Sequence, residues 1–306
     1  MSRIYEALKR AEEQREASGS PEKPRPIDSA SAGAVNCVGT GQRSAEILSS
    51  LTLGGPSPSS QYLRIDDLRR RCKRPGWRLD LNTVVFCDKQ SFVHCAEQFR
   101  TLRSHLDQVR GVQQVRTLLV TSTLPNEGKT FVALNLAHSI VRQPGRKALL
   151  VDADLRASRL HVPMGAPSAP GLADFLRGEA DEFSIIQTDG RSDLFFIPAG
   201  KKIANPAELV ANGELKSLLD RLAPAFDWVI LDAPPILPIA DASILAGMCD
   251  GVIFVVRAGS TGFDLAQTAC QELRGKNLLG VVLNRAEEIE TYGAYSYYGG
   301  NAMDQR

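Results

Sequence analysis

The sequence contains no apolar run long enough to cross a bilayer and no apolar leader segment at its start. Its six cysteines include no C-x-x-C pair and no zinc-like spacing, so reduced thiols fit better than a disulfide framework or a zinc site. The 36 Lys and Arg side chains nearly balance the 35 Asp and Glu side chains. Because neither sign dominates, net charge gives no general attraction to nucleic acid or acidic lipid.

The first 91 residues differ in composition from the rest of the chain. Residues 1–17 place apolar side chains at helical spacing and predict a short N-terminal amphipathic helix. Residues 18–60 are rich in Gly, Ser, Pro and Ala without periodicity, so we predict a flexible linker. Residues 61–91 form a basic connecting segment with a run from Arg69 to Arg74. Such a run is usually a solvated face, and contact with a phosphate-bearing surface is the alternative.

Between residues 92 and 285, short apolar segments alternate with segments of helical length. The expected strands are 117–122, 147–152, 194–197, 228–232, 251–256 and 278–283. The expected helices are 92–109, 129–142, 171–177, 206–222, 241–247 and 263–274. Apolar strands that alternate with helices predict an α/β fold with a mostly parallel sheet covered by helices on both faces. Residues 286–306 form a Tyr-rich tail without a core pattern.

One strand-to-helix junction has the composition of a phosphate-binding loop. Residues 117–135 pass from an apolar strand through Gly128-Lys129-Thr130 into a helix. In a P-loop, backbone N–H groups surround the phosphates, the Lys reaches the β/γ oxygens and the following hydroxyl binds Mg²⁺. Thr123 stands where the first Gly of G-x-x-x-x-G-K-[ST] belongs, but the strand–loop–helix context still predicts phosphate binding.

Acidic residues follow two further apolar strands. Asp152 and Asp154 end one of them, and Asp232 ends another. Ligands of open parallel sheets bind beyond the carboxyl ends of the strands. Each acidic residue alone is a common turn residue, but three near one P-loop predict convergence on a single Mg²⁺–nucleotide.

Residues 97–298 resemble the bacterial tyrosine autokinases of polysaccharide synthesis, the BY-kinases of the CpsD/CapB type, which are P-loop NTPases. Asn126 stands where their first motif usually has Gly, and Ala157-Ser158 stand where Arg-Pro is frequent, but both carboxylates of the second motif are present. The matching motifs are Walker A at 121–130, Walker A′ at 149–156 and Walker B at 229–235.

The resemblance assigns roles around the nucleotide. Lys129 is implied to contact the β/γ phosphates, Thr130, Asp154 and Asp232 to hold the metal, and Asp152 to receive the proton of the acceptor tyrosine. The motif alone does not separate the roles of Asp152 and Asp154. The implied nucleotide contacts are Pro125, Asn126, Glu127, Gly128, Lys129, Thr130, Phe131 and Asn284. Asn284 is expected near adenine, with a simple strand-end turn as the alternative.

Two features match this family rather than P-loop proteins at large. Glu97, Arg100 and Arg103 fit the E-x-x-R-x-x-R element that joins subunits into a ring, and an exposed intrahelical ion pair is the alternative. The tail carries aromatic residues among small ones, which the resemblance implies are phosphoacceptors. These residues are Tyr292, Tyr295, Tyr297 and Tyr298.

The resemblance therefore implies an ATP- and Mg²⁺-dependent protein-tyrosine autokinase that regulates exopolysaccharide or capsule synthesis and export. It implies a homo-oligomeric ring, a separate transmembrane activator, a tyrosine phosphatase and no nucleic-acid partner. We expect a cytoplasmic protein held at the inner face of the plasma membrane through its partner. The alternatives are a partitioning-type ATPase switch and a nucleotide-binding adaptor without kinase activity. Leu124 argues against the partitioning group, which typically has a Lys early in this loop.

Overall fold

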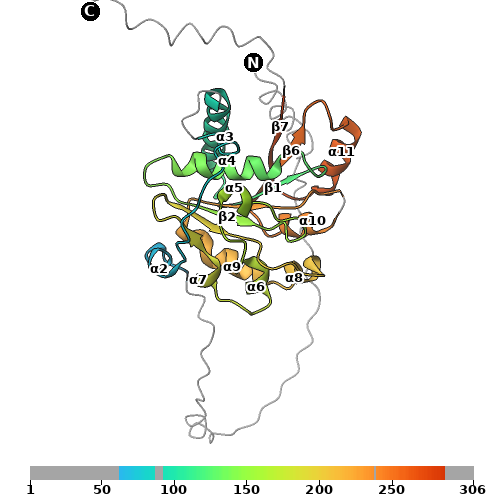
Figure 1. The fold of residues 1–306 in the computed structure, drawn as a ribbon. Helices are drawn as coiled ribbons and strands as arrows, with labels where there is room; N and C mark the ends of the chain where they lie inside the picture. The colour runs from blue at the N-terminus through green and yellow to red at the C-terminus, as the bar shows by residue number, and fades with distance from the viewer. Residues whose placement is uncertain (1–61, 87–91, 238, 287–306) are drawn as a thin grey trace, which may run out of the picture.

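The computed structural model describes residues 62–86, 92–237 and 239–286 (Figure 1). The predicted helix at 1–17, the linker at 18–60 and the four candidate acceptor tyrosines lie outside the described residues. Within the described part, no helix is long and apolar enough to cross a membrane. The four cysteines in the same part, which are Cys72, Cys95, Cys249 and Cys270, are free thiols.

A seven-stranded sheet forms the centre of the described residues, in the order β3-β4-β2-β5-β1-β6-β7. Six of its strands run parallel, and β3 pairs antiparallel with β4 at one edge. The predicted mostly parallel sheet is therefore confirmed. The strands are β1 (Thr117–Ser122), β2 (Ala148–Asp152), β3 (Gln187–Thr188), β4 (Leu194–Ile197), β5 (Trp228–Asp232), β6 (Gly251–Arg257) and β7 (Leu278–Asn284).

Helices cover both faces of the sheet, as Figure 1 shows. One face packs against α3 (Val93–Val112), α4 (Lys129–Val141) and α5 (His161–Met164). The other face packs against α2 (Ile65–Arg71), α6 (Leu172–Leu176), α7 (Glu182–Ile185), α8 (Pro206–Ala211), α9 (Glu214–Leu222), α10 (Asp241–Ala246) and α11 (Phe263–Glu272).

The central strands contain uninterrupted apolar stretches because both of their faces are covered. In β1, Leu119 packs into one core, while Leu118 and Val120 pack into the other, and all three are fully buried. Side chains of a strand alternate between the two faces, so a strand that packs between two helical layers needs apolar residues at successive positions. This requirement explains the uninterrupted apolar runs of the sequence.

The helix expected at 206–222 is two helices. α8 ends at Ala211 and α9 starts at Glu214. Gly213 between them has a φ of +88°, a left-handed conformation that glycine adopts at little cost. The apolar spacing continues across this break, which is why the sequence pattern did not reveal it.

The basic connecting segment belongs in part to the packed unit. Leu68 of α2 is fully buried, and Val84 and Val85 lie in the core beneath α3 and α4. The amide N–H of Thr188 in β3 donates to the carbonyl of Lys73 at 3.0 Å. Residues 62–86 therefore fold onto the sheet, and the packed unit starts before residue 92.

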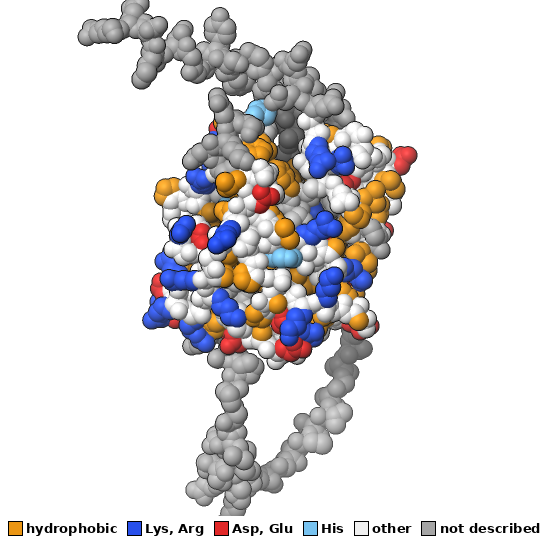
Figure 2. All heavy atoms as spheres, viewed as in Figure 1, with side chains coloured by type: hydrophobic (Ala, Val, Ile, Leu, Met, Phe, Trp, Pro, Cys, Tyr) orange, Lys and Arg blue, Asp and Glu red, His pale blue; other side chains and the backbone are white. Residues whose placement is uncertain are grey.

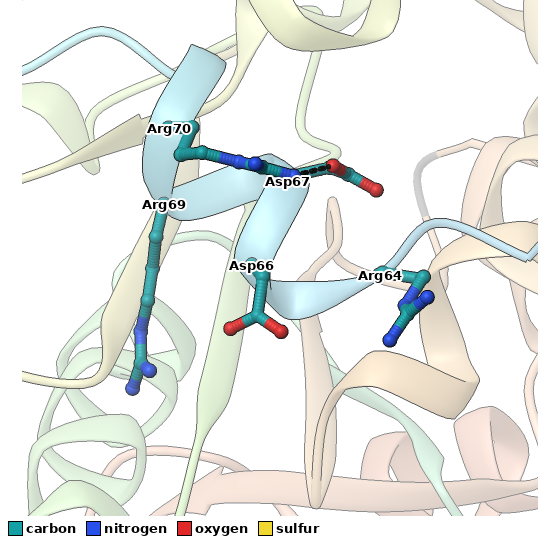
Figure 3. Close-up of a pocket in the computed structure, with 5 residues that line it drawn as sticks. All are labelled: Arg64, Asp66, Asp67, Arg69 and Arg70. Carbon is teal, nitrogen blue, oxygen red and sulfur yellow. Dashed lines mark hydrogen bonds and ion pairs between the residues drawn. The ribbon is translucent and has the colours of Figure 1, made fainter.

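The arginines of this segment have partners on the protein itself. Arg70 contacts Asp67 at 2.6 Å within a surface hollow lined by α2 (Figure 3). Arg69 pairs with Asp193 at 2.6 Å, and the Arg71 guanidinium lies 3.5 Å from the ring centroid of Phe183. Lys and Arg side chains are spread over the visible face in Figure 2. These contacts favour the solvated-face interpretation of the basic run.

Candidate active site

The phosphate-binding loop between β1 and α4 passes through two left-handed residues. Asn126 has a φ of +66° and Gly128 a φ of +100°. This conformation favours glycine at position 128, and a Cβ there would lie 1.9 Å from Asn284 Nδ2, so the Asn284 side chain would have to move. α4 starts at the next residue, Lys129. Backbone N–H groups at such a helix start favour a bound phosphate.

The Lys129 ammonium lies among carboxylates from two other strands. Its Nζ is 2.9 Å from Asp154 Oδ2 and 3.5 Å from Asp232 Oδ1. Burial by itself would lower the pKa of Lys129, but Asp232 and Asp154 together raise the pKa above its ordinary value. The ammonium is therefore charged and already paired at the site where the sequence predicts a nucleotide.

Asp152 and Asp232 lie opposite each other at the carboxyl ends of β2 and β5. Their exposed fractions are 0% and 1%. Burial and the nearby Asp232 hold the pKa of Asp152 well above its usual range. Burial also raises the pKa of Asp232, although Lys129 and the Thr130 hydroxyl oppose this effect. Two buried carboxyl groups that share one ammonium favour a further cation or a proton.

Asp152 and Asp154 have different hydrogen-bond environments. Asp154 accepts bonds from Lys129 Nζ and, at 2.9 Å, from the Ala157 amide N–H. Asp152 accepts a 3.2 Å bond from the Leu160 amide through Oδ2. Its buried Oδ1 has no hydrogen-bond partner among the described residues. Asp152 therefore keeps an oxygen available for a proton, whereas both oxygens of Asp154 are occupied.

An ion pair that the sequence did not reveal fixes the loop after β2. Arg156 Nε is 2.7 Å from Asp241 Oδ2, and Arg156 Nη2 is 3.0 Å from Asp241 Oδ1. This bidentate contact joins the loop that carries Asp154 to the start of α10. Arg156 is visible in the motif, but its partner lies 85 residues away and has no local pattern.

The predicted metal ligands lie together at this end of the sheet. Thr130 Oγ1 donates a 2.7 Å hydrogen bond to Asp232 Oδ2, and Asp154 reaches the same Lys129 ammonium. Among the described residues, no group of three or more His, Cys, Asp or Glu side chains forms a metal site. Mg²⁺ at a nucleotide site uses one or two protein oxygens with phosphate oxygens and water. The Thr130 hydroxyl beside the Asp232 carboxylate can supply those one or two protein oxygens.

The other expected nucleotide contacts lie in two places: some are in the phosphate-binding loop or contact it, and one packs between two helices. Pro125 and Asn126 are exposed at the tip of the loop, and Asn284 Nδ2 donates a 2.8 Å bond to the Glu127 carbonyl. The Phe131 ring packs edge to face on Phe99, with 5.8 Å between centroids, so it belongs to the contact between α3 and α4. The expected contact of Asn284 with adenine stays a prediction.

The three expected oligomerisation residues do not share one environment. Glu97 and Arg100 form an intrahelical ion pair and are 59% and 48% exposed. Arg103 Nη1 instead donates a 2.5 Å bond to the Ser139 carbonyl of α4. Arg103 therefore braces α3 against α4 within its own subunit, whereas Glu97 and Arg100 remain accessible.

Comparison with known proteins points to the same family that the sequence motifs resemble. The family model described as an AAA domain matches residues 126–268. The tyrosine-protein kinase YwqD of Bacillus subtilis is 33% identical over 229 residues, which cover 74% of this chain and 95% of YwqD. The succinoglycan biosynthesis transport protein ExoP of Rhizobium meliloti is 33% identical over 222 residues, covering 71% of this chain and 28% of ExoP.

A solved structure extends the similarity to the fold. The kinase domain of the Escherichia coli tyrosine kinase ETK matches with a TM-score of 0.61 and 30% identity, covering 63% of this chain and 76% of that domain. The residues that the family model matches include Lys129, Thr130 and the three carboxylates of the acidic cluster. The chain therefore belongs to the bacterial tyrosine-protein kinases of the CpsD/CapB type and is a P-loop tyrosine kinase.

Proposed function

We propose that this kinase uses ATP and Mg²⁺ to phosphorylate its own C-terminal tyrosine cluster in trans, and that this regulates exopolysaccharide or capsule synthesis and export. The observation that carries the proposal is the cluster around Lys129. One ammonium lies among Asp152, Asp154 and Asp232 at the end of a P-loop. Such an arrangement supports phosphoryl transfer, which needs charge neutralisation and alignment more than covalent help.

Lys129 exchanges carboxylates for phosphate oxygens in this mechanism. Its Nζ starts 2.9 Å from Asp154, and the ammonium then offsets the charge that develops on the transferred group. Thr130, Asp232 and Asp154 would hold the metal, which supplies further charge neutralisation on the phosphates. Without Lys129 as its partner, Asp154 would have one carboxylate oxygen available for that metal.

Asp152 receives the proton of the acceptor tyrosine. Its unpartnered Oδ1 and its raised pKa make this carboxylate a better proton acceptor than an exposed one. The Leu160 amide holds the other oxygen and orients the carboxylate. The proton moves from the tyrosine hydroxyl to Asp152 as the tyrosine oxygen forms its bond to the γ-phosphorus of ATP. The bond from that phosphorus to the β–γ bridging oxygen breaks, and ADP leaves.

The tail supplies the acceptors, Tyr292, Tyr295, Tyr297 and Tyr298, which follow β7 closely in the sequence. A tether raises the local concentration of a tyrosine near the site of a neighbouring subunit. Each phosphate adds roughly −1.5 to −2 charges at pH 7. Several phosphates repel one another and the acidic site, so the tail leaves, the ring loosens and a tyrosine phosphatase resets the cycle.

The proposed partners follow from the family and from the exposed residues. The exposed Glu97 and Arg100 support a role in ring contacts, whereas the role of Arg103 there is indirect. The name of ExoP connects that relative to polysaccharide transport, and this chain covers 28% of it. We infer a separate transmembrane activator that holds the kinase at the cytoplasmic face of the membrane, with no nucleic-acid partner.

A mixing experiment tests the proposal. A full-length Lys129→Met subunit is combined with an active subunit that lacks residues 286–306, labelled ATP is added, and phosphotyrosines are mapped. We expect phosphate on the tail of the inactive subunit. Labelling mainly within residues 1–90, or no labelling of that tail, contradicts transfer in trans. ATP hydrolysis without phosphotyrosine instead supports the partitioning-type switch.

A further inference from the structure

Glu127 connects the P-loop to the ends of two strands that carry none of the acidic cluster. Its side chain is 3% exposed. One carboxylate oxygen accepts the Leu124 amide N–H at 3.0 Å, and the other accepts the hydroxyl of Thr261. Its backbone carbonyl accepts the Asn284 side-chain amide at 2.8 Å. This one residue therefore joins its own loop to the regions that follow β6 and end β7.

Thr261 and Asn284 are themselves anchored to the sheet. Asn284 is the last residue of β7 and pairs with Arg257, the last residue of β6. The Ala258 amide donates to the Asn284 carbonyl at 2.9 Å, and the Thr261 amide donates to the Arg257 carbonyl at 3.2 Å. Both side chains therefore approach the P-loop from backbone whose position the sheet fixes.

The P-loop needs such support because of its own conformation. Asn126 is a non-glycine residue with a φ of +66°, and left-handed backbone costs free energy when a Cβ is present. The Asn284 amide also fills the space beside Gly128. An unsupported loop would relax toward other conformations, and a bound phosphate would then have to reorder it.

We propose that Thr261 and Asn284 form a clamp that acts through Glu127 and holds the P-loop in its phosphate-binding conformation. They are positioning residues for nucleotide binding and phosphoryl transfer. The clamp gives Asn284 a role in phosphate binding that is separate from any contact with adenine. It does not depend on which tyrosine accepts the phosphate.

Two ligands separate a clamp from an adenine contact. Mg²⁺–ADP contains the base, whereas tripolyphosphate with Mg²⁺ contains only phosphates. Calorimetry on the full chain measures the Kd of each ligand for the parent, Thr261→Val and Asn284→Asp. Thr261→Val preserves shape but removes the hydroxyl, and Asn284→Asp removes the amide donor. Each variant loses one hydrogen bond that holds the P-loop. We therefore expect each variant to bind both ligands about tenfold more weakly than the parent, with an equal loss for the two ligands.

A conservative variant and a double variant complete the test. Thr261→Ser keeps the hydroxyl and should bind both ligands within about twofold of the parent. Because both residues act through Glu127, the Thr261→Val/Asn284→Asp double variant should lose less affinity than the product of the single losses. Thermal unfolding of each variant checks that the fold is retained.

Three results would overturn the clamp. Parent-like affinity in Thr261→Val excludes the Thr261 contact from phosphate binding. Weaker binding of ADP with unchanged binding of tripolyphosphate in Asn284→Asp assigns Asn284 to adenine. A double variant that loses the full product shows two independent sites. All of these measurements are of binding, so they hold whether or not the tail is the substrate.

Discussion

The strand β5 has a carboxylate at each end, and the two have opposite environments. Asp227, just before the strand, accepts bonds from Arg110 Nη1 at 3.1 Å, Arg146 Nη1 at 2.8 Å and the Lys147 amide at 2.9 Å. Burial would raise its pKa, but these donors together lower the pKa below its ordinary value. Charge at this end is fully compensated within the protein.

At the other end of β5, Asp232 shares Lys129 with Asp154 and faces Asp152. Burial raises the pKa of both Asp232 and Asp152. The protein therefore places more acidic charge here than its own cation neutralises. The comparison teaches that one strand has a first end whose charge is balanced, which suits a structural role, and a last end whose charge is not, which suits the ligand site that we propose.

The largest expected effect is the loss of activity in Lys129→Met. Removal of the ammonium takes away the charge that stabilises the transferred phosphoryl group, so we expect phosphotyrosine formation to fall by about 10³-fold. The matched control is Arg146→Met, which removes a cation from the balanced end and should retain the parent rate. Incubation with labelled ATP followed by phosphotyrosine detection measures both. Equal phosphotyrosine signal in Lys129→Met and the parent contradicts the assignment.

The second effect is on stability at the balanced end. Asp227→Asn loses the charge that pairs with Arg110 and Arg146, so we expect about 2 kcal/mol less stability at pH 7 by urea unfolding. Since the folded pKa of Asp227 is lowered, its contribution is present above the ordinary pKa of 3.8 and is lost as pH falls through the folded pKa. The difference between variant and parent should therefore shrink in acid. A difference that stays constant with pH contradicts the ion-pair account.

The same change of Asp to Asn at the other end of β5, in Asp152→Asn, should stabilise the protein. Ionisation of Asp152, whose folded pKa is raised, costs stability as pH rises above the ordinary value of 3.8 and through the folded pKa. Asp152→Asn removes this cost, so we expect the variant without nucleotide to be more stable by about 1 kcal/mol at pH 7. The gain should disappear in acid, where both forms are neutral. A variant that is less stable than the parent at pH 7 contradicts excess negative charge at this site.

A smaller effect concerns His138 of α4, away from both ends of β5. Burial and then Arg142 lower its pKa from 6.5 to about 4. The unfolded chain therefore takes up a proton between these two values before the folded chain does, and stability falls as pH drops through that window. Because the side chain is only partly buried, we expect a loss of about 1 kcal/mol. His138→Gln should flatten the pH dependence of the free energy of unfolding between pH 6.5 and 4. An unchanged slope would show that other groups cause the acid sensitivity.

The sequence predicted the elements whose pattern is local. The strands at 117–122 and 228–232 have the predicted bounds because each is built around a short apolar run, which is typical of a strand that is buried on both faces. α2 was not predicted, since its seven residues bury only Leu68 and are otherwise dominated by charge. β3 has two residues and depends on β4 for its pairing, so no pattern marks it.

The same distinction between local sequence patterns and tertiary contacts applies to the candidate active site. Lys129, Thr130, Asp152, Asp154 and Asp232 were recognisable because each ends or follows a strand in a motif of fixed spacing. Their convergence followed from the rule that ligands bind beyond the carboxyl ends of parallel strands. The contacts of Glu127 with Thr261 and of Arg156 with Asp241 join residues 134 and 85 positions apart. Such pairs depend on the tertiary fold and have no local pattern.

The most direct test of the account compares the two ends of β5 in one assay. The initial rate of phosphotyrosine formation is measured for Asp152→Asn and Asp227→Asn at a temperature where both remain folded. We predict that Asp152→Asn loses at least about 100-fold, because the tyrosine proton loses its acceptor, while Asp227→Asn stays within about threefold of the parent. A parent-like rate in Asp152→Asn, or an equal loss in both variants, would contradict a division of β5 into a structural end and a catalytic end.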